Sequence, residues 1–221
     1  MNRRAPMIAG VAFAVLYATA VLVLPAVQGT DQGAARVQAL LLAFAALALV
    51  FVLAFARDRL SGPPAHLFTV GSALLVAQLC AAIWFISGSA VRPGQTASVN
   101  SALGDVGSMW LPTATIANIL IAVPVLLSAN EDRLPRWLGI GAAVFTVEQL
   151  IETITIIGPP GSFISPGGPM NHYLGGTLSV AFFVALGAAV TLPEKAAEAA
   201  EPSDESARVD DDAPVQETTA E

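Results

Sequence analysis

Charged side chains are scarce in this chain of 221 residues. Asp, Glu, Lys and Arg together make up 12% of it, whereas an average soluble domain contains about 25%. Hydrophobic residues make up 55%, and the mean hydropathy is +0.67. This composition excludes an ordinary soluble domain and indicates a membrane protein.

Cysteine and the common catalytic motifs are also missing or nearly so. The single cysteine, Cys80, excludes an intramolecular disulfide framework and a metal site built from several cysteines. The chain has no Gly-x-Ser-x-Gly, no His-Glu-x-x-His and no Gly-x-x-x-x-Gly-Lys motif. We therefore expect no catalytic residue and no enzymatic activity.

Basic residues are few and scattered. The chain contains ten, nine of them arginine, a bias typical of GC-rich bacterial genomes. Residues 193–221 hold ten acidic and two basic side chains, whereas residues 1–192 hold seven acidic and eight basic ones. The net charge of −7 therefore belongs to the tail, and no basic surface for nucleic acid is present.

Long apolar runs dominate what remains. A helix that crosses the hydrocarbon core of a bilayer needs about 20 mostly apolar residues. Six stretches meet this length: 7–27, 38–56, 67–87, 109–129, 137–157 and 173–192. The sequence predicts an all-α, polytopic bundle of six transmembrane helices in contact with the lipid bilayer.

The distribution of basic residues predicts the orientation, because Lys and Arg near the ends of spans stay in the cytoplasm. If the N-terminus is cytoplasmic, the segments on that side contain Arg3, Arg4, Arg57, Arg59, Arg133, Arg136, Lys195 and Arg208. The opposite side contains only Arg36 and Arg92. We expect a bacterial plasma-membrane protein with both termini in the cytoplasm.

The composition divides the chain into two parts. Residues 1–192 form the predicted transmembrane domain, and residues 193–221 are rich in Ala, Glu, Asp, Ser and Pro without apolar periodicity. Such a segment cannot bury a core, so we expect a disordered, acidic, cytoplasmic tail. It is typical of a solvating tail, and docking of a protein partner through Asp210, Asp211 and Asp212 is the alternative.

The links between spans carry further expectations. Residues 88–108 and 158–172 are predicted to be long outer loops, the second rich in Pro and Gly.

His66 and His172 fall at opposite ends of spans, about 30 Å apart, and cannot bind one ion. We expect no metal site and no cofactor. Gly139 with Ala143, and Gly176 with Val180 and Val184 near Gly187, have a spacing that allows spans 5 and 6 to approach closely, although such residues are also ordinary in membrane helices.

Two carboxylates distinguish the fifth span. Glu148 and Glu152 are four residues apart, which places both on one face of a helix. Glu148 falls near the midplane of the membrane, and no Lys or Arg lies within a predicted span. Because desolvation and the second carboxylate both disfavour the charged form, we expect Glu148 to be protonated near neutral pH and Glu152 at least partly so.

Polar residues of other spans are predicted at similar depths. Gln78, Asn118 and Tyr17 lie at the level of Glu148, and Thr115 lies near that of Glu152, as does Ser179. Together with the two glutamates, Gln78, Asn118, Tyr17 and Thr115 are the candidates for a proton-binding or cation-binding centre. Span 2 has an apolar interior and is expected to face lipid.

Two functions fit this polar centre. One is a small transport protein linked to a proton or cation, because intramembrane carboxylates are costly and usually face the interior of a bundle. The negative charge of the carboxylates would also suit an amine-bearing solute. The other is a non-catalytic scaffold or accessory subunit, in which a neutral, hydrogen-bonded knot joins the helices.

The segment Leu134-Pro135-Arg136-Trp137-Leu138-Gly139, followed by a span and a Gly/Pro-rich outer turn, carries a resemblance. In its last two spans the chain resembles uncharacterised small multi-pass membrane proteins of high-GC Gram-positive bacteria. The resemblance implies a multi-pass membrane location. It implies no activity and supplies no catalytic residue.

Overall fold

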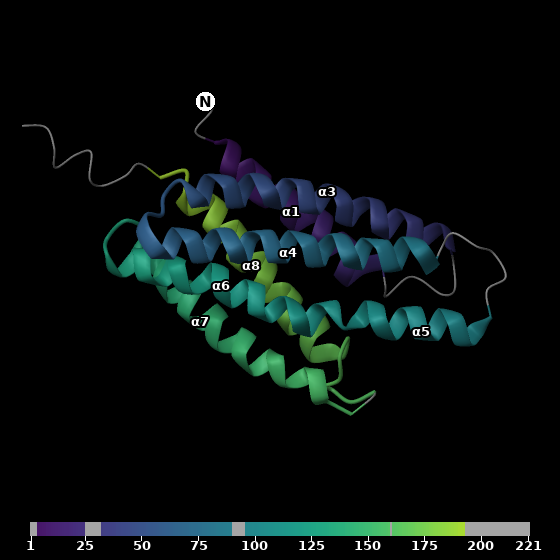
Figure 1. The fold of residues 1–221 in the computed structure, drawn as a ribbon. Coiled ribbons are helices and arrows are strands. Elements are labelled where there is room, and N and C mark those ends of the chain that lie inside the picture. Colours follow the sequence, from purple (N-terminus) through teal and green to yellow (C-terminus); the bar gives the residue numbers. More distant parts are fainter. Residues whose placement is uncertain (1–3, 25–31, 90–95, 160, 193–221) are drawn as a thin grey trace, which may run out of the picture.

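The computed structural model describes residues 4–24, 32–89, 96–159 and 161–192, and within these ranges all regular structure is helical. The helices lie side by side in one bundle (Figure 1). The all-α prediction is therefore confirmed. The predicted acidic tail, 193–221, lies outside the described residues.

Six continuous helical segments are long and apolar enough to cross a membrane, as predicted. They are built from the following elements: α1 (Ala5–Ala18) with η1 (Thr19–Val23), α3 (Gln32–Arg57), α4 (Gly62–Ser89), α5 (Ala97–Ser108) with α6 (Trp110–Asn130), α7 (Arg136–Glu152) with η2 (Thr153–Ile157), and η3 (Met170–Gly175) with α8 (Gly176–Ala189). This architecture is compatible with an integral membrane protein. Most helices extend a few residues beyond the predicted spans, since interfacial residues continue the helical hydrogen bonding.

The predicted outer loop 88–108 differs from the structure, because its second half forms helix α5. Val99, Leu103 and Val106 recur at helical spacing in a stretch without proline, and this favours a helix over a loop. A Cβ on Gly107 would lie 3.7 Å from Cβ of Phe85, so α5 packs on the end of α4. Figure 1 shows α5 and α6, which comes next in the chain, arranged end to end almost along one line.

Two ends of the bundle are named here for later use. The short-link half contains the links 58–61 and 131–135, and the α5 half contains α5 and residues 158–169. In the short-link half, α4 crosses α6 closely at Gly71. A Cβ there would lie 2.7 Å from Cβ of Leu120 and 2.9 Å from its carbonyl carbon. Only a residue without a side chain fits this crossing.

The glycines expected to join spans 5 and 6 pack on other helices. A Cβ on Gly139 of α7 would lie 2.7 Å from Cβ of Ala129 on α6, and one on Gly187 of α8 would lie 2.8 Å from the carbonyl oxygen of Pro6. That expectation was wrong about the partners. The link 131–135 forces α6 and α7 together, while Gly187 faces Gly10 on α1.

Aromatic rings fill the bundle next to these contacts. The rings of Phe145 and Phe182 are stacked with centroids 4.5 Å apart, and Phe183 lies edge-on to both. Phe13 of α1 meets Phe183 edge to face at 5.5 Å. All four side chains are buried, so they form a closed apolar layer between α1, α7 and α8.

Large apolar side chains also cover the outside of the bundle. Val15, Trp84 and Ile140 are more than half exposed, as expected for residues that contact lipid rather than water. Helix α3 has an exposed apolar face, which includes Leu40, Phe44 and Leu47, as expected for a helix that faces lipid. Another face, which includes Leu42 and Leu49, is buried against the neighbouring helices.

Candidate functional site

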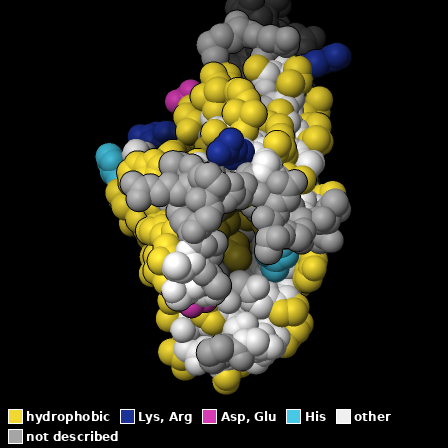
Figure 2. Space-filling model, turned by 90° about the vertical axis from the view of Figure 1, so that its right-hand side faces the viewer, with side chains coloured by type: hydrophobic (Ala, Val, Ile, Leu, Met, Phe, Trp, Pro, Cys, Tyr) yellow, Lys and Arg dark blue, Asp and Glu magenta, His cyan; other side chains and the backbone are white. Residues whose placement is uncertain are grey.

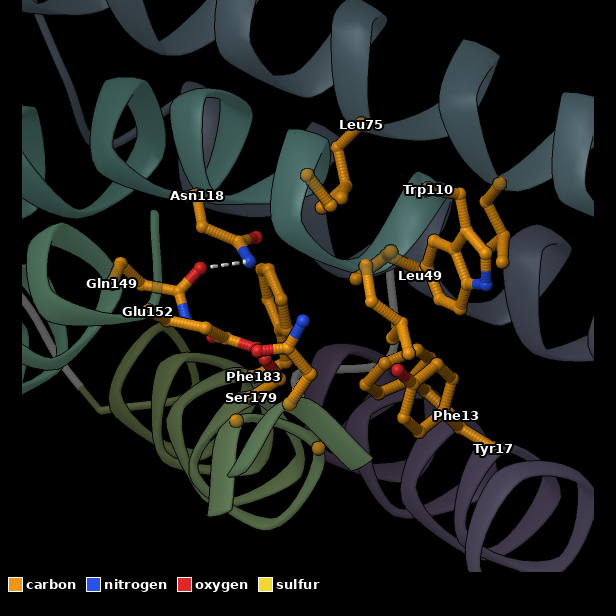
Figure 3. A pocket seen from close by; sticks show the side chains of 16 residues that line it. Phe13, Tyr17, Leu49, Leu75, Trp110, Asn118, Gln149, Glu152, Ser179 and Phe183 are labelled. Carbon is orange, nitrogen blue, oxygen red and sulfur yellow. Dashed lines mark hydrogen bonds between the residues drawn. The ribbon is translucent and has the colours of Figure 1, made fainter. Parts of the chain in front are cut away.

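A small cavity lies inside the bundle, and side chains from all six spans line it (Figure 3). Its volume is about 30 Å³, which is enough for about two water molecules. The polar lining residues, apart from the Trp110 indole, are Tyr17, Asn118, Gln149, Glu152, Asn171 and Ser179. The other lining residues are apolar, and none of the lining residues described is basic.

Helix α7 brings the two carboxyl groups together. Glu148 and Glu152 are 8% and 3% exposed, and they lie one helical turn apart on the buried face. The Gln149 amide nitrogen donates to Oε2 of both carboxyl groups, at 2.7 Å each. One amide nitrogen therefore holds the two carboxyl groups next to each other.

Helix α6 is joined to α7 by polar side chains at the same level. The Asn118 amide nitrogen donates to Oε1 of Gln149 at 2.6 Å, as drawn in Figure 3. The hydroxyl groups of Thr115 and Thr153 are hydrogen-bonded at 2.9 Å. These bonds connect two helices, whereas the bonds from Gln149 to the glutamates stay within α7.

Asn171 enters the site from η3. Its side chain is 0% exposed, and its amide nitrogen donates to Oγ1 of Thr155 at 2.9 Å. The Thr155 hydroxyl in turn donates to the backbone carbonyl oxygen of Glu152 at 2.7 Å. This chain of bonds fixes the Asn171 side chain against the end of α7.

Three buried oxygens at this centre have no hydrogen-bond partner in the protein: Oδ1 of Asn118, Oδ1 of Asn171 and Oε1 of Glu148. Both asparagine nitrogens are engaged, so the amide orientations leave their oxygens free. A buried acceptor without a partner costs about 1–3 kcal/mol. The centre is therefore suited to a donor or a positive charge, such as water, a proton or a small cation.

The absence of a side chain at Gly175 leaves room for the Glu152 carboxyl group. A Cβ on Gly175 would overlap both carboxyl oxygens of Glu152. Gly175 ends η3, where the helix is wound more widely than an α-helix. Since the glycine has no side chain, Glu152 approaches the backbone of this segment directly.

Three spans change their winding around the site. η1 and η3 are π-helical, and η2, which follows Glu152 directly, is a 3₁₀-helix. π-helical turns within α-helices occur often at functional sites, because they re-aim side chains. The irregular winding here presents Asn171 and Gly175 to Glu152.

Aromatic side chains close the opposite side of the cavity. Figure 3 shows Gln149 and Glu152 on one side and Phe13 and Tyr17 on the other. Tyr17 is buried, and its ring meets Trp110 edge to face at 6.4 Å. The end of the bundle that carries α5 is hollowed at its centre, with hydrophobic side chains at the bottom of the hollow (Figure 2).

The structure gathers most of the candidates predicted from the sequence. Tyr17, Asn118 and Glu152 line the cavity, and Glu148 adjoins it through Gln149. The other two candidates lie apart. Gln78 donates to the backbone carbonyl oxygen of Thr113 at 3.0 Å, and Thr115 bonds Thr153; neither lines the cavity.

Two central residues were missed in the sequence. Gln149 lies between the two glutamates in the sequence and is 1% exposed, but the helical spacing did not predict that it would bond to both of them. The feature that could have identified Gln149 is an uncharged hydrogen-bond donor next to two acidic residues in the sequence. Asn171 fell outside predicted span 6, because the preceding Pro-Gly-Gly-Pro is typical of a loop.

The described residues contain no group of three or more His, Cys, Asp or Glu side chains arranged to hold a metal ion. Cys80 is half-buried and unpaired. The His172 ring meets the Tyr173 ring edge to face at 5.3 Å, and His172 does not line the cavity. The oxygen atoms around Glu152 are thus the main polar constellation in the described part of the bundle.

Comparison with known proteins adds no further assignment. The chain matches no protein-family model, no curated protein and no solved structure. The candidate site therefore rests on its own geometry and chemistry.

Proposed function

We propose that this chain is a small proton- or cation-linked transport protein of the bacterial plasma membrane, in which Glu148 and Glu152 bind the ion. The proposal is based on a pair of buried carboxyl groups that accept hydrogen bonds from one amide nitrogen, beside a cavity with no basic residue among its lining. Ionisable groups inside a membrane protein are costly, and they usually mark ion pathways or proton relays.

The size of the cavity narrows the choice of ligand. Pockets for drug-sized molecules measure about 300–1,000 Å³, whereas this cavity measures about 30 Å³. That volume favours a proton or a small inorganic cation over the amine-bearing solute that the sequence also allowed. The proposal includes no catalytic residue and no enzymatic reaction.

The proposed orientation has both termini in the cytoplasm. It is supported by the eight basic residues on that side against two on the other. In this orientation the short-link half faces the cytoplasm and the α5 half faces outward. Glu152 then lies on the outer side of Glu148 along α7.

A scaffold or accessory subunit is the alternative function, and one observation favours it. The bonds Asn118 to Gln149 and Thr115 to Thr153 join α6 to α7 as a structural knot would. This role accounts for the amides and hydroxyls. It does not account for Glu148 and Glu152, whose bonds from Gln149 lie within one helix.

The test is ion movement in liposomes that contain the purified full-length chain. Dyes sensitive to pH and to sodium, enclosed in the liposomes, report entry of either ion after a gradient is applied. We expect the wild-type chain to move one of them and the Glu148→Gln/Glu152→Gln double variant to lose this activity. No movement by the wild-type chain would contradict transport and favour the scaffold.

The matched control is Glu131→Gln. Glu131 is exposed and pairs with Arg133 at 3.1 Å, away from the cavity. The same change of Glu to Gln therefore removes a carboxylate without touching the site. We expect this variant to retain wild-type ion movement.

A further inference from the structure

The two carboxyl groups differ in their access to the cavity, and this difference extends the proposed function. Glu152 lines the cavity. Glu148 does not line it, is 8% exposed, and has an unpartnered oxygen, Oε1, that is fully buried. Gln149 Nε2 donates to both carboxyl groups and holds Glu148 next to Glu152, so Glu152 provides the route from the cavity to Glu148.

The cavity is built to hold water next to Glu152. Its volume of about 30 Å³ accommodates about two water molecules, each of which needs two to four polar partners. Oδ1 of Asn118 and Oδ1 of Asn171 are free acceptors, and Asn171 is completely buried. The hydroxyl groups of Tyr17 and Ser179 supply further partners at the lining.

Few titratable groups face Glu152. Among the lining residues, Tyr17 on α1 is the other titratable side chain; α6, η3 and α8 contribute the uncharged Asn118, Asn171 and Ser179. The lining residues from α3 and α4 are leucines. Glu148 on α7 itself is the remaining acid in contact.

We propose that the bound ion is the proton, which Glu152 accepts from water in the cavity and passes to Glu148. Of the two acids, a metal ion in the cavity reaches Glu152 alone, whereas a proton can pass between the two neighbouring carboxyl groups. Hydronium gives a proton to the Glu152 carboxylate and becomes water. When Glu148 is ionised, the O–H bond of Glu152 breaks as a new O–H bond forms on the Glu148 carboxylate, so charge and atoms balance.

The inference rests on the proposed function, and its first test separates the two. Proton entry into the liposomes is measured in sodium buffer and in choline buffer. We expect equal entry in both. Ion movement that requires sodium would overturn the proton assignment and leave the proposed function standing, whereas no movement of either ion would overturn both.

The order of the two acids is tested by infrared spectroscopy on the purified full-length chain, with each carboxyl band assigned from a Glu→Gln variant. We expect the Glu152 band in Glu148→Gln to respond to the pH of the medium as in the wild-type chain. In Glu152→Gln, we expect the Glu148 band to lose this response. Glu131→Gln should leave both bands unchanged.

A Glu148 band that still follows the pH in Glu152→Gln would overturn the relay, because Glu148 would then have its own access to water. Glu152→Asp provides a second variant that keeps the acid but shortens the side chain. We expect it to slow hydrogen–deuterium exchange at Glu148 without abolishing it. Unchanged exchange in this variant would also contradict the relay.

Discussion

The short-link half and the α5 half of the bundle use opposite means of packing. In the first, regular α-helices meet at Gly71, Gly139 and Gly187 with almost no space between them, and stacked phenyl rings continue the apolar layer. In the second, three spans depart from α-helical winding around a cavity with unpartnered oxygens. Ser72 Oγ beside Gly71 is also buried and unpartnered, but the unpartnered oxygens of Asn118 and Asn171 belong to residues that line the cavity.

This difference indicates that one half contributes most to stability and the other contains the candidate site. Dense contacts resist rearrangement, whereas a cavity and irregular helices allow side chains and water to shift at a small free-energy cost. We infer that the short-link half holds the fold while the α5 half adapts to the ion. Three substitutions test this division, in order of decreasing effect on stability.

Phe145→Ala should cause the largest loss of stability. Phe145 is buried in the stacked aromatic layer, and a phenyl ring removed from such a core costs about 3–5 kcal/mol in the free energy of unfolding. Unfolding by dodecyl sulfate in mixed micelles, followed by circular dichroism, measures the loss. Phe163→Ala is the control, because Phe163 is 61% exposed; equal losses for both variants would contradict the division.

Gly71→Ala should have an intermediate effect. The added methyl group would meet Cβ of Leu120 at 2.7 Å and the α6 backbone at 2.9 Å, and such overpacking costs about 1–3 kcal/mol. The same unfolding assay measures it. At Gly141 of α7, nothing lies within 4 Å of an added Cβ, so Gly141→Ala should not destabilise. If both variants unfold alike, the close crossing of α4 and α6 is not what stabilises this half.

Gly175→Ala should have the smallest effect on stability and a large one on ion movement. The added methyl group displaces the Glu152 carboxyl group, which is the end of a flexible side chain and can move at little cost. We expect near wild-type unfolding with loss of ion entry into liposomes. Gly176→Ala is the neighbouring control, since its Cβ would make an ordinary 3.5 Å contact with Leu22. Full activity in Gly175→Ala would show that the position of Glu152 is not critical.

Apolar run length was sufficient to predict the six spans, because a bilayer demands uninterrupted hydrophobic helices. It failed at α5, where Val99 and Val106 are spaced for a helix but diluted by serine and glycine. The partners of Gly139 and Gly187 were also wrong. Small residues show that a close contact exists, but the neighbouring helix is set by three-dimensional packing.

Depth counting identified part of the candidate site. Because helical rise per residue is constant, depth counting put Tyr17 and Asn118 at the level of Glu148, and both line the cavity that Glu148 adjoins through Gln149. It misplaced Gln78, since depth says nothing of the direction in which a side chain points. Asn171 was invisible to this method because a π-helical turn extends the span into a segment that reads as a loop.

The continuous helix Ser101–Asn130 has 30 residues, which corresponds to about 45 Å at the α-helical rise. The hydrocarbon core of a bilayer is about 30 Å thick, so the first turns of this segment, which belong to α5, extend beyond the lipid tails. Among the described residues, α5 is a helix at the end of the bundle to which an antibody fragment or a fused domain can bind. α5 is therefore a suitable attachment site for a fiducial marker that orients this protein in electron microscopy images.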